Sequence, residues 1–245
     1  MNRNHLKIIA CVSMLCDHMG YLLFPGATAL RWIGRLAMPL FAFFIGEGCR
    51  YTHDRKRYVL RLSVLAGVCQ AAYFAEELIA GGRLTVSSGC WYFNILCTFA
   101  LACGACFLCL DADRARAEGQ IKKAAGRLAL LAAYLTALAA FTWFAWRQRN
   151  TAGWSLYLDY GLCGVLLPLS AALFADKKRK LAAFSCAVIV YCLVFTREMP
   201  YVWFSLLALP LLLAYNGQGG SKKPRYLFYV FYPAHLAILY LIAQL

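Results

Sequence analysis

The sequence predicts an all-α polytopic integral membrane protein with about nine transmembrane helices, and its composition is the first reason for that prediction. Of the 245 residues, 62% are hydrophobic and only 15% are charged, and the mean hydropathy is +0.61. Soluble domains are about half apolar and about a quarter charged. We therefore expect a single membrane domain over residues 1–245, surrounded mainly by the lipid bilayer.

Apolar segments of spanning length, or slightly shorter, recur along the whole chain and are the second reason. Lipid cannot satisfy the backbone groups of an open sheet edge, so each segment is predicted to be a helix. The nine segments are 6–24, 32–49, 58–80, 90–110, 128–146, 157–175, 181–196, 200–215 and 226–245. The stretch 111–127 carries mixed charge and is predicted to be a long loop, with room for a short interfacial helix.

The distribution of lysine and arginine is the third reason, and it predicts the orientation. The N-terminus and every second loop hold 19 of the 25 basic residues, and the other loops hold five. The positive-inside rule then places the N-terminus in the cytoplasm and the C-terminus outside, in a multi-pass protein of the cytoplasmic membrane. A signal peptide would carry Asp17 and His18 in its apolar region, so we predict that segment 6–24 is a retained helix.

Charge and cysteine content exclude other classes of protein. The net charge of +14 would suit nucleic acid only on a soluble fold with a basic face, and here the basic residues lie between apolar runs, so no nucleic-acid partner is expected. Most of the twelve cysteines lie inside apolar runs and are predicted to pack as small hydrophobes. Cys103, Cys106 and Cys109 fan out around a helix, so no metal site is predicted.

Ionisable residues at bilayer depth form the candidate catalytic site. Each costs a few kcal/mol to bury in lipid and is by default a functional hypothesis. Asp17 and His18 lie midway along the first segment, Arg35 lies in the second and His235 lies midway along the last. Adjacent helical residues point about 100° apart, so Asp17 and His18 should find separate partners, and Arg35 is the expected partner of Asp17.

Two interpretations of these residues remain open. A buried Asp–Arg pair alone would fix helix packing without chemistry. Two histidines at matching depth favour a reactive site, because histidine titrates near neutral pH and serves as a general acid or base.

Further residues are candidates for binding. Clustered lysine and arginine attract phosphate groups of an anionic lipid or a phosphorylated cofactor, although topology alone accounts for most such clusters. Tyr232 precedes His235 by three residues and so shares its helix face. The candidates for cofactor binding are Arg50, Tyr51, Arg55, Arg57, Lys222, Lys223, Arg225 and Tyr232. The candidates for substrate binding are Asn94, Asp159 and Tyr160, near the outer ends of the fourth and sixth segments.

Six stretches follow one another in a distinctive order from Leu6 to His235. They read LKIIACVSMLCDHMG, IGRLAMPLFAFFIGEGCRYTHDRKRYVLRL, NILCTFAL, DYGLCGVLLPL, AYNG and FYVFYPAHL. Together they resemble the TraX family of membrane proteins. The family is named for a conjugation protein that N-acetylates the amino terminus of pilin, and it is similar to multipass acyltransferases that use acetyl-CoA. The polar positions that the resemblance carries over are Asp17, His18, Arg35, Asn94, Asp159 and His235.

The resemblance implies an acetyl-CoA-dependent membrane acyltransferase, with transfer to an amine favoured over transfer to a hydroxyl. His18 or His235 would be the general base, Asp17 would orient a histidine, and Arg35 would hold Asp17 or stabilise an oxyanion. Direct transfer and an acetyl-histidine intermediate both stay open. The acceptor is left open as a peptide, a glycan or a small molecule, and so is the oligomeric state.

Two other functions compete with acyl transfer. A proton-coupled membrane transporter would use Asp17, His18 and His235 as a relay. Inverted repeats would favour a transporter, and none is evident in the sequence. A non-catalytic membrane scaffold is the third possibility.

Overall fold

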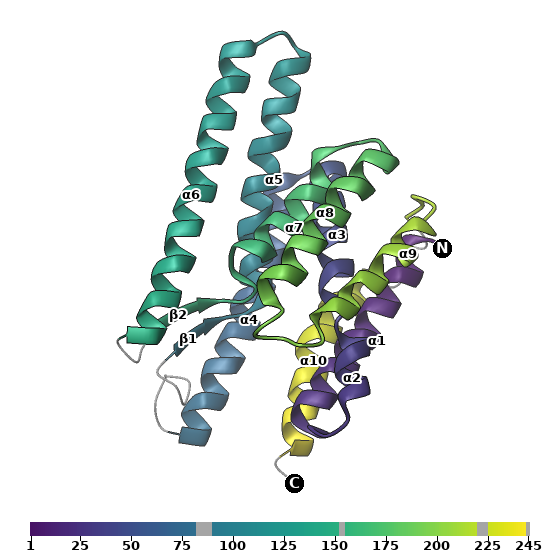
Figure 1. Cartoon of the computed structure of the whole chain (residues 1–245), viewed down its shortest axis with the longest axis vertical. Coiled ribbons are helices and arrows are strands. Elements are labelled where there is room, and N and C mark those ends of the chain that lie inside the picture. Colours follow the sequence, from purple (N-terminus) through teal and green to yellow (C-terminus); the bar gives the residue numbers. More distant parts are fainter. Residues whose placement is uncertain (82–89, 152–154, 220–224, 244–245) are drawn as a thin grey trace. The chain divides into compact units, whose positions relative to one another are not determined.

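The computed structural model describes residues 1–81, 90–151, 155–219 and 225–243, and most of these residues are helical (Figure 1). The helices are α1 (Arg3–Leu22), α2 (Thr28–Gly34), α3 (Ala37–Tyr51), α4 (Arg55–Gly81), α5 (Ile95–Ala117), α6 (Ile121–Thr151), α7 (Gly161–Leu173), α8 (Lys177–Phe195), η1 (Val202–Leu207), α9 (Ala208–Leu213) and α10 (Arg225–Ala243). Two short strands, β1 (Cys90–Phe93) and β2 (Ser155–Leu158), complete the described elements. The predicted all-α class is confirmed.

Four helical stretches in the described part of the chain are long and apolar enough to cross a membrane. They are Thr28–Tyr51, Arg55–Ala75, Ile95–Ala117 and Ile121–Gln148. Shorter apolar helices occupy Gly161–Leu173, Val202–Leu213 and Val230–Ala243. These helices support a membrane protein, whereas the count of nine spans and the orientation of the termini stay predictions.

The second predicted segment, 32–49, is not one continuous helix. It breaks between α2 and α3, at Arg35 and Leu36. Pro39 explains the break, because it has no N–H to donate to the carbonyl four residues earlier, which is that of Arg35. The Ser205 hydroxyl donates to that carbonyl instead, at 3.0 Å. The break therefore places Arg35 at a helix junction, where side chains from other elements reach it.

The predicted long loop at 111–127 is wrong. Helix α5 continues to Ala117 and α6 begins at Ile121, so only a short turn at 118–120 separates them. The alanines and arginines of this stretch favour helix, and Gly119 adopts the left-handed conformation, with φ of +73°, that the turn requires. Figure 1 shows α5 and α6 as a long antiparallel hairpin. The charged residues Asp111, Asp113 and Arg114 thus lie on a helix.

The segments 90–110 and 157–175 begin as strands, contrary to the prediction that they are wholly helical. Strands β1 and β2 pair in parallel, with Tyr92 opposite Tyr157 and their rings stacked at 5.9 Å. The Gln70 amide donates to the Tyr92 carbonyl at 2.7 Å. Strand pairing and the Gln70 amide thus satisfy backbone groups of Tyr92, as extended backbone inside a membrane protein requires.

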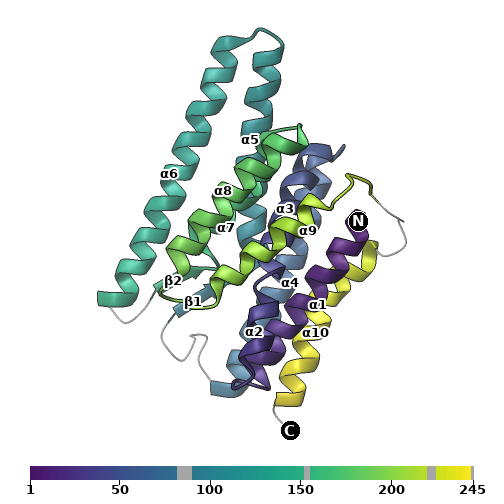
Figure 2. The ribbon, with the colours of Figure 1, turned by 45° about the vertical axis from the view of Figure 1, so that its right-hand side comes forward.

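The chain divides into two compact units. The first comprises Met1–Phe44 and Asp176–Leu245, and the second comprises Ile45–Ala175. In the first unit, α1 lies beside α10 and packs against α2 (Figure 2). At one end of this unit the N-terminal ammonium donates to the Ala214 carbonyl at 2.7 Å, and Lys177 donates to the Tyr215 carbonyl at 2.6 Å. Three segments predicted to be cytoplasmic therefore meet at one end.

Small residues form much of the core of the second unit, in which α5 packs against α6 and α7. Ala102, Cys103, Ala105 and Cys106 are fully buried on α5. All eleven cysteines whose side chains the structure describes are free. Small side chains let helix backbones approach closely in membranes, where van der Waals packing drives association. Seven of the eleven described cysteines are buried, as the sequence predicts, whereas Cys186 is exposed.

Candidate functional site

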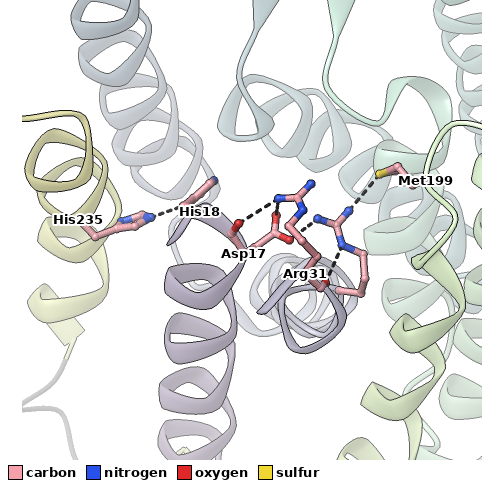
Figure 3. A network of polar contacts seen from close by, with 6 residues as sticks. Asp17, His18, Arg31, Met199 and His235 are labelled. Carbon is pink, nitrogen blue, oxygen red and sulfur yellow. Dashed lines mark hydrogen bonds and ion pairs between the residues drawn. The ribbon is translucent and has the colours of Figure 1, made fainter. Parts of the chain in front are cut away.

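Helix α1 presents Asp17 and His18 to two different neighbours within the first unit. Because the two residues are adjacent, their side chains leave the helix about 100° apart. Figure 3 shows Asp17 turned toward Arg31 and His18 turned toward His235. The prediction that Asp17 and His18 do not pair with each other is confirmed.

Two arginines hold the Asp17 carboxylate. Arg35 forms a direct ion pair with it through Nη2. Arg31 Nη1 lies 3.1 Å from the other carboxylate oxygen and 2.9 Å from the Asp17 carbonyl oxygen. The expected pairing of Asp17 with Arg35 is confirmed, and Arg31 is a partner that the sequence analysis missed. Its signal was available, because Arg31 precedes Arg35 by four residues and so lies on the same helix face.

The rest of the Arg35 side chain is held inside the first unit. Its side chain is only 5% exposed, and its Nη1 lies 3.0 Å from the Met199 sulfur. Gly34 allows the close approach of α2 to α1, because a Cβ atom at Gly34 would lie 2.7 Å from the Asp17 Cα. Nothing in the sequence signalled the roles of Met199 and Gly34, because both depend on which helices pack together.

His18 and His235 contact each other directly. The His18 Nδ1 lies 2.8 Å from the His235 Nε2, and the His235 Nδ1 lies 2.7 Å from the Phe231 carbonyl oxygen. These partners assign the tautomers of the neutral pair. A carbonyl oxygen only accepts, so the His235 Nδ1 carries a hydrogen and its Nε2 accepts from the His18 Nδ1. The His18 Nε2 is then left with a lone pair, as a base requires.

Aromatic rings fix the orientation of His235. Its ring stacks on Phe231, with centroids 4.9 Å apart, and Tyr232 meets it edge-on at 5.9 Å. The predicted common face of Tyr232 and His235 is thus confirmed as a ring contact. A role for Tyr232 in cofactor binding stays a prediction.

The residues predicted to bind phosphate lie in several places. Arg50 and Arg55, in the second unit, line one cavity of about 310 Å³. Arg57 forms an ion pair with Asp54 at 3.1 Å, and Tyr51 is 60% exposed at the end of α3. Lys222 and Lys223 lie outside the described residues, as does the side chain of Arg225, which begins α10.

The residues predicted to bind substrate lie where β1 and β2 lead into helices of the second unit. Asn94 caps α5: its oxygen accepts from the Leu96 N–H at 3.0 Å, and its nitrogen donates to the Ala66 carbonyl at 3.1 Å. The carbonyl of Asp159 accepts from the Thr98 hydroxyl at 2.8 Å, and Tyr160 has a left-handed backbone with φ of +56°. This geometry gives Asn94 an architectural role, and substrate binding by the three residues stays a prediction.

Comparison with known proteins decides the family. The sequence profile of the TraX protein family matches residues 2–243. The chain belongs to the TraX family. The resemblance seen in the sequence motifs is thereby confirmed, and the match runs through both compact units.

Two relatives of this TraX chain come from different bacteria. A probable fimbrial assembly protein, FimC of serogroup H1, from Dichelobacter nodosus is 28% identical over 255 aligned residues, which cover 96% of this chain and 92% of that protein. An uncharacterized protein of Rickettsia prowazekii (strain Madrid E) is 51% identical over 87 residues, which cover 36% of this chain and 34% of that protein. No solved structure gave a significant match.

A substitution at Asn94 can show whether this residue of the TraX protein stabilises the fold or binds the substrate. We expect Asn94→Ala to lower the free energy of unfolding by about 2 kcal/mol or more, because it removes a helix cap and leaves buried partners without their hydrogen bonds. The check is the midpoint of thermal unfolding in detergent, with Gln120→Ala, an exposed amide, as control. An unchanged midpoint with a raised KM for the acceptor would support substrate contact instead.

Proposed function

We propose that this TraX protein is an integral membrane acyltransferase, which moves the acetyl group of acetyl-CoA to an amine on an acceptor presented in the membrane or outside it. The observation that supports this most is the hydrogen-bonded chain from His18 through His235 to the Phe231 carbonyl. Such a chain fixes the tautomer of both rings and leaves one basic nitrogen, on His18.

His18 acts as the general base in this proposal. Its Nε2 accepts a proton from the attacking amine as the amine becomes a nucleophile. The hydrogen bond from the His18 Nδ1 to the His235 Nε2 keeps the His18 ring in one orientation while it carries this proton. His235 is therefore a positioning residue, whose own N–H is held by the Phe231 carbonyl.

The geometry supports one of the two roles considered for Arg35. All three nitrogens of its guanidinium are engaged, with Asp17, with Met199 and with the Arg31 carbonyl at 3.4 Å. An oxyanion would have to compete with these partners. Arg35 thus holds Asp17 in place, and Asp17 in turn fixes the segment of α1 that carries His18.

Acetyl-CoA, when bound, would supply the thioester carbonyl that the amine attacks. The carbon–sulfur bond would break as the amide forms, and coenzyme A would leave as the thiol with the proton that His18 had accepted. Arg50 and Arg55 fit its phosphate groups, because both line a cavity that also holds Arg114. Guanidinium groups pair with phosphate oxygens through two parallel hydrogen bonds.

A peptide amine is the favoured acceptor. The relative from Dichelobacter nodosus is named a probable fimbrial assembly protein, and it aligns with 96% of this chain. That name supports an acceptor among exported subunits of a surface structure, with the amino-terminal amine as the group modified.

Mass spectrometry of the cell envelope tests this proposal. Cells with the wild-type protein, without it, and with His18→Ala would be fed isotopically labelled acetate, and envelope peptides and glycans would be compared. We expect labelled acetyl groups on a peptide amine only in the wild type. Identical acetylation in all three strains would contradict the proposal.

A further inference from the structure

Three arginines from separate helix ends of the second unit line one cavity. Arg50 lies one residue before the end of α3, Arg55 begins α4 and Arg114 lies near the end of α5. Leu110 and Asp113 complete the lining of a space of about 310 Å³. This volume is at the lower end for small-molecule sites, so the cavity suits a single polar group better than a whole large ligand.

Arg50 is fixed in place without being neutralised. Its Nε and Nη2 donate to the Ala172 carbonyl at 3.0 and 2.7 Å, and Nη2 also donates to the Leu173 carbonyl at 2.9 Å. These carbonyls belong to the last turn of α7. These carbonyls orient the guanidinium and offset part of its charge, since they lie at the negative end of the α7 dipole, and the carboxylate near it, that of Asp113, is weakly held. Arg50 therefore presents a preorganised cation to the cavity.

Arg55 is more fully paired. Its Nη1 lies 2.6 Å from the Asp111 carboxylate, and its guanidinium lies 4.8 Å above the Phe107 ring. The ion pair and the ring hold the side chain against α5. Arg55 therefore forms a fixed wall of the cavity rather than its main source of charge.

The side chains of Arg114 and Asp113 are exposed and loosely held, so their charges can move toward or away from the cavity. The side chain of Arg114 is exposed and makes no hydrogen bond or ion pair within the described residues. The Asp113 carboxylate lies 3.8 Å from Arg50 and is 56% exposed, so this pair is weak. Three guanidinium groups face two carboxylates, Asp111 and Asp113, and an excess of positive charge remains.

We propose that this cavity binds a phosphate group, which displaces Asp113 from Arg50 and draws in Arg114. Once Asp113 has turned to water, the excess positive charge matches the two negative charges that a phosphomonoester carries at most near neutral pH. The phosphomonoester of coenzyme A and the headgroup of phosphatidic acid, an anionic lipid, share this chemistry. Only the coenzyme A source rests on the proposed acetyl transfer.

The first experiment measures coenzyme A binding by calorimetry, with the full chain in nanodiscs of phosphatidylcholine. We expect Arg114→Ala to raise the Kd about tenfold, as loss of a charge-assisted pair would. Arg116→Ala is the matched control, because it removes an exposed arginine two residues along the same helix and off the cavity, and it should leave the Kd unchanged. Asp113→Asn should lower the Kd about threefold, because the competing carboxylate is gone.

The second experiment measures retention of phosphatidic acid by native mass spectrometry, with the same variants. Lipid retention that falls in Arg114→Ala and rises in Asp113→Asn, without such an effect on coenzyme A, assigns the site to lipid and supports it. If neither ligand responds to these two variants, the proposal is overturned. Acetyl transfer is assayed in parallel, to distinguish failure of the phosphate site from failure of the proposed acetyltransferase activity. If the acetyl donor occupies the cavity, Arg114→Ala should raise the KM for acetyl-CoA and leave kcat unchanged.

Discussion

Replacing His18 with alanine is expected to lower the rate of acetyl transfer by about 1,000-fold, a loss in the range measured when a general base is removed. The reason is the tautomer assignment, which leaves the basic lone pair on the His18 Nε2. His235→Ala should cost less, about 10- to 100-fold, because it removes a group that positions the base and not the base itself. The measurement is kcat with labelled acetyl-CoA in proteoliposomes.

Controls for the histidine prediction come from the same chain. His5 and His53 are exposed, and their replacement by alanine should leave kcat unchanged. His235→Gln should retain more activity than His235→Ala, because the glutamine oxygen can still accept the His18 Nδ1–H. If His18→Ala stays active while His235→Ala is dead, the two roles are reversed and the assignment of the base is wrong.

Replacing Asp17 with asparagine is expected to destabilise the protein by about 3–5 kcal/mol, the loss found when one member of a buried ion pair is removed. Arg35 is 5% exposed and would lose its carboxylate. Arg31→Gln should cost only about 1 kcal/mol, since the Arg31 side chain is 26% exposed and Asp17 keeps Arg35. Chemical denaturation in detergent, followed by tryptophan fluorescence, measures these differences.

The double variant Asp17→Asn with Arg35→Gln separates charge from packing. It removes both charges, so it should regain much of the stability that Asp17→Asn loses. Arg35→Gln alone completes the comparison. If the double variant loses as much stability as Asp17→Asn and Arg35→Gln lose in sum, the two residues do not act as a pair, and the ion pair assigned to this site is wrong.

The pairing of Asp17 with Arg35 was predictable because opposite charges in neighbouring apolar spans have few other partners. The meeting of His18 with His235 followed from their matching depth. Arg31 was missed although its spacing from Arg35 was informative, because it lies just outside the predicted segment 32–49 and so resembles a loop cation. The break at Arg35 was also missed, although Pro39 marks it.

The strand pairing and the grouping of the arginines could not be predicted, because both depend on contacts between residues far apart in the sequence. The parallel pairing of β1 with β2 joins residues far apart in the chain, and each strand reads simply as the apolar start of a helix. The basic cluster around Arg50 to Arg57 read as one patch, yet Arg57 pairs with Asp54 while Arg50 and Arg55 meet Arg114 from α5. The local sequence around Arg50, Arg55 and Arg114 does not indicate that these three residues line one cavity.

The most direct test of the central claim is the turnover of labelled acetyl-CoA by the purified protein in proteoliposomes, with an amine-bearing envelope extract as acceptor. We expect free coenzyme A to form, labelled acetyl groups to appear on peptide amines, and both to depend on His18. Mass spectrometry is the suitable readout, because the twelve cysteines would react with thiol reagents. A wild-type protein that neither binds nor consumes acetyl-CoA would contradict the account, and proton uptake driven by a pH gradient in the same vesicles would instead support a transporter.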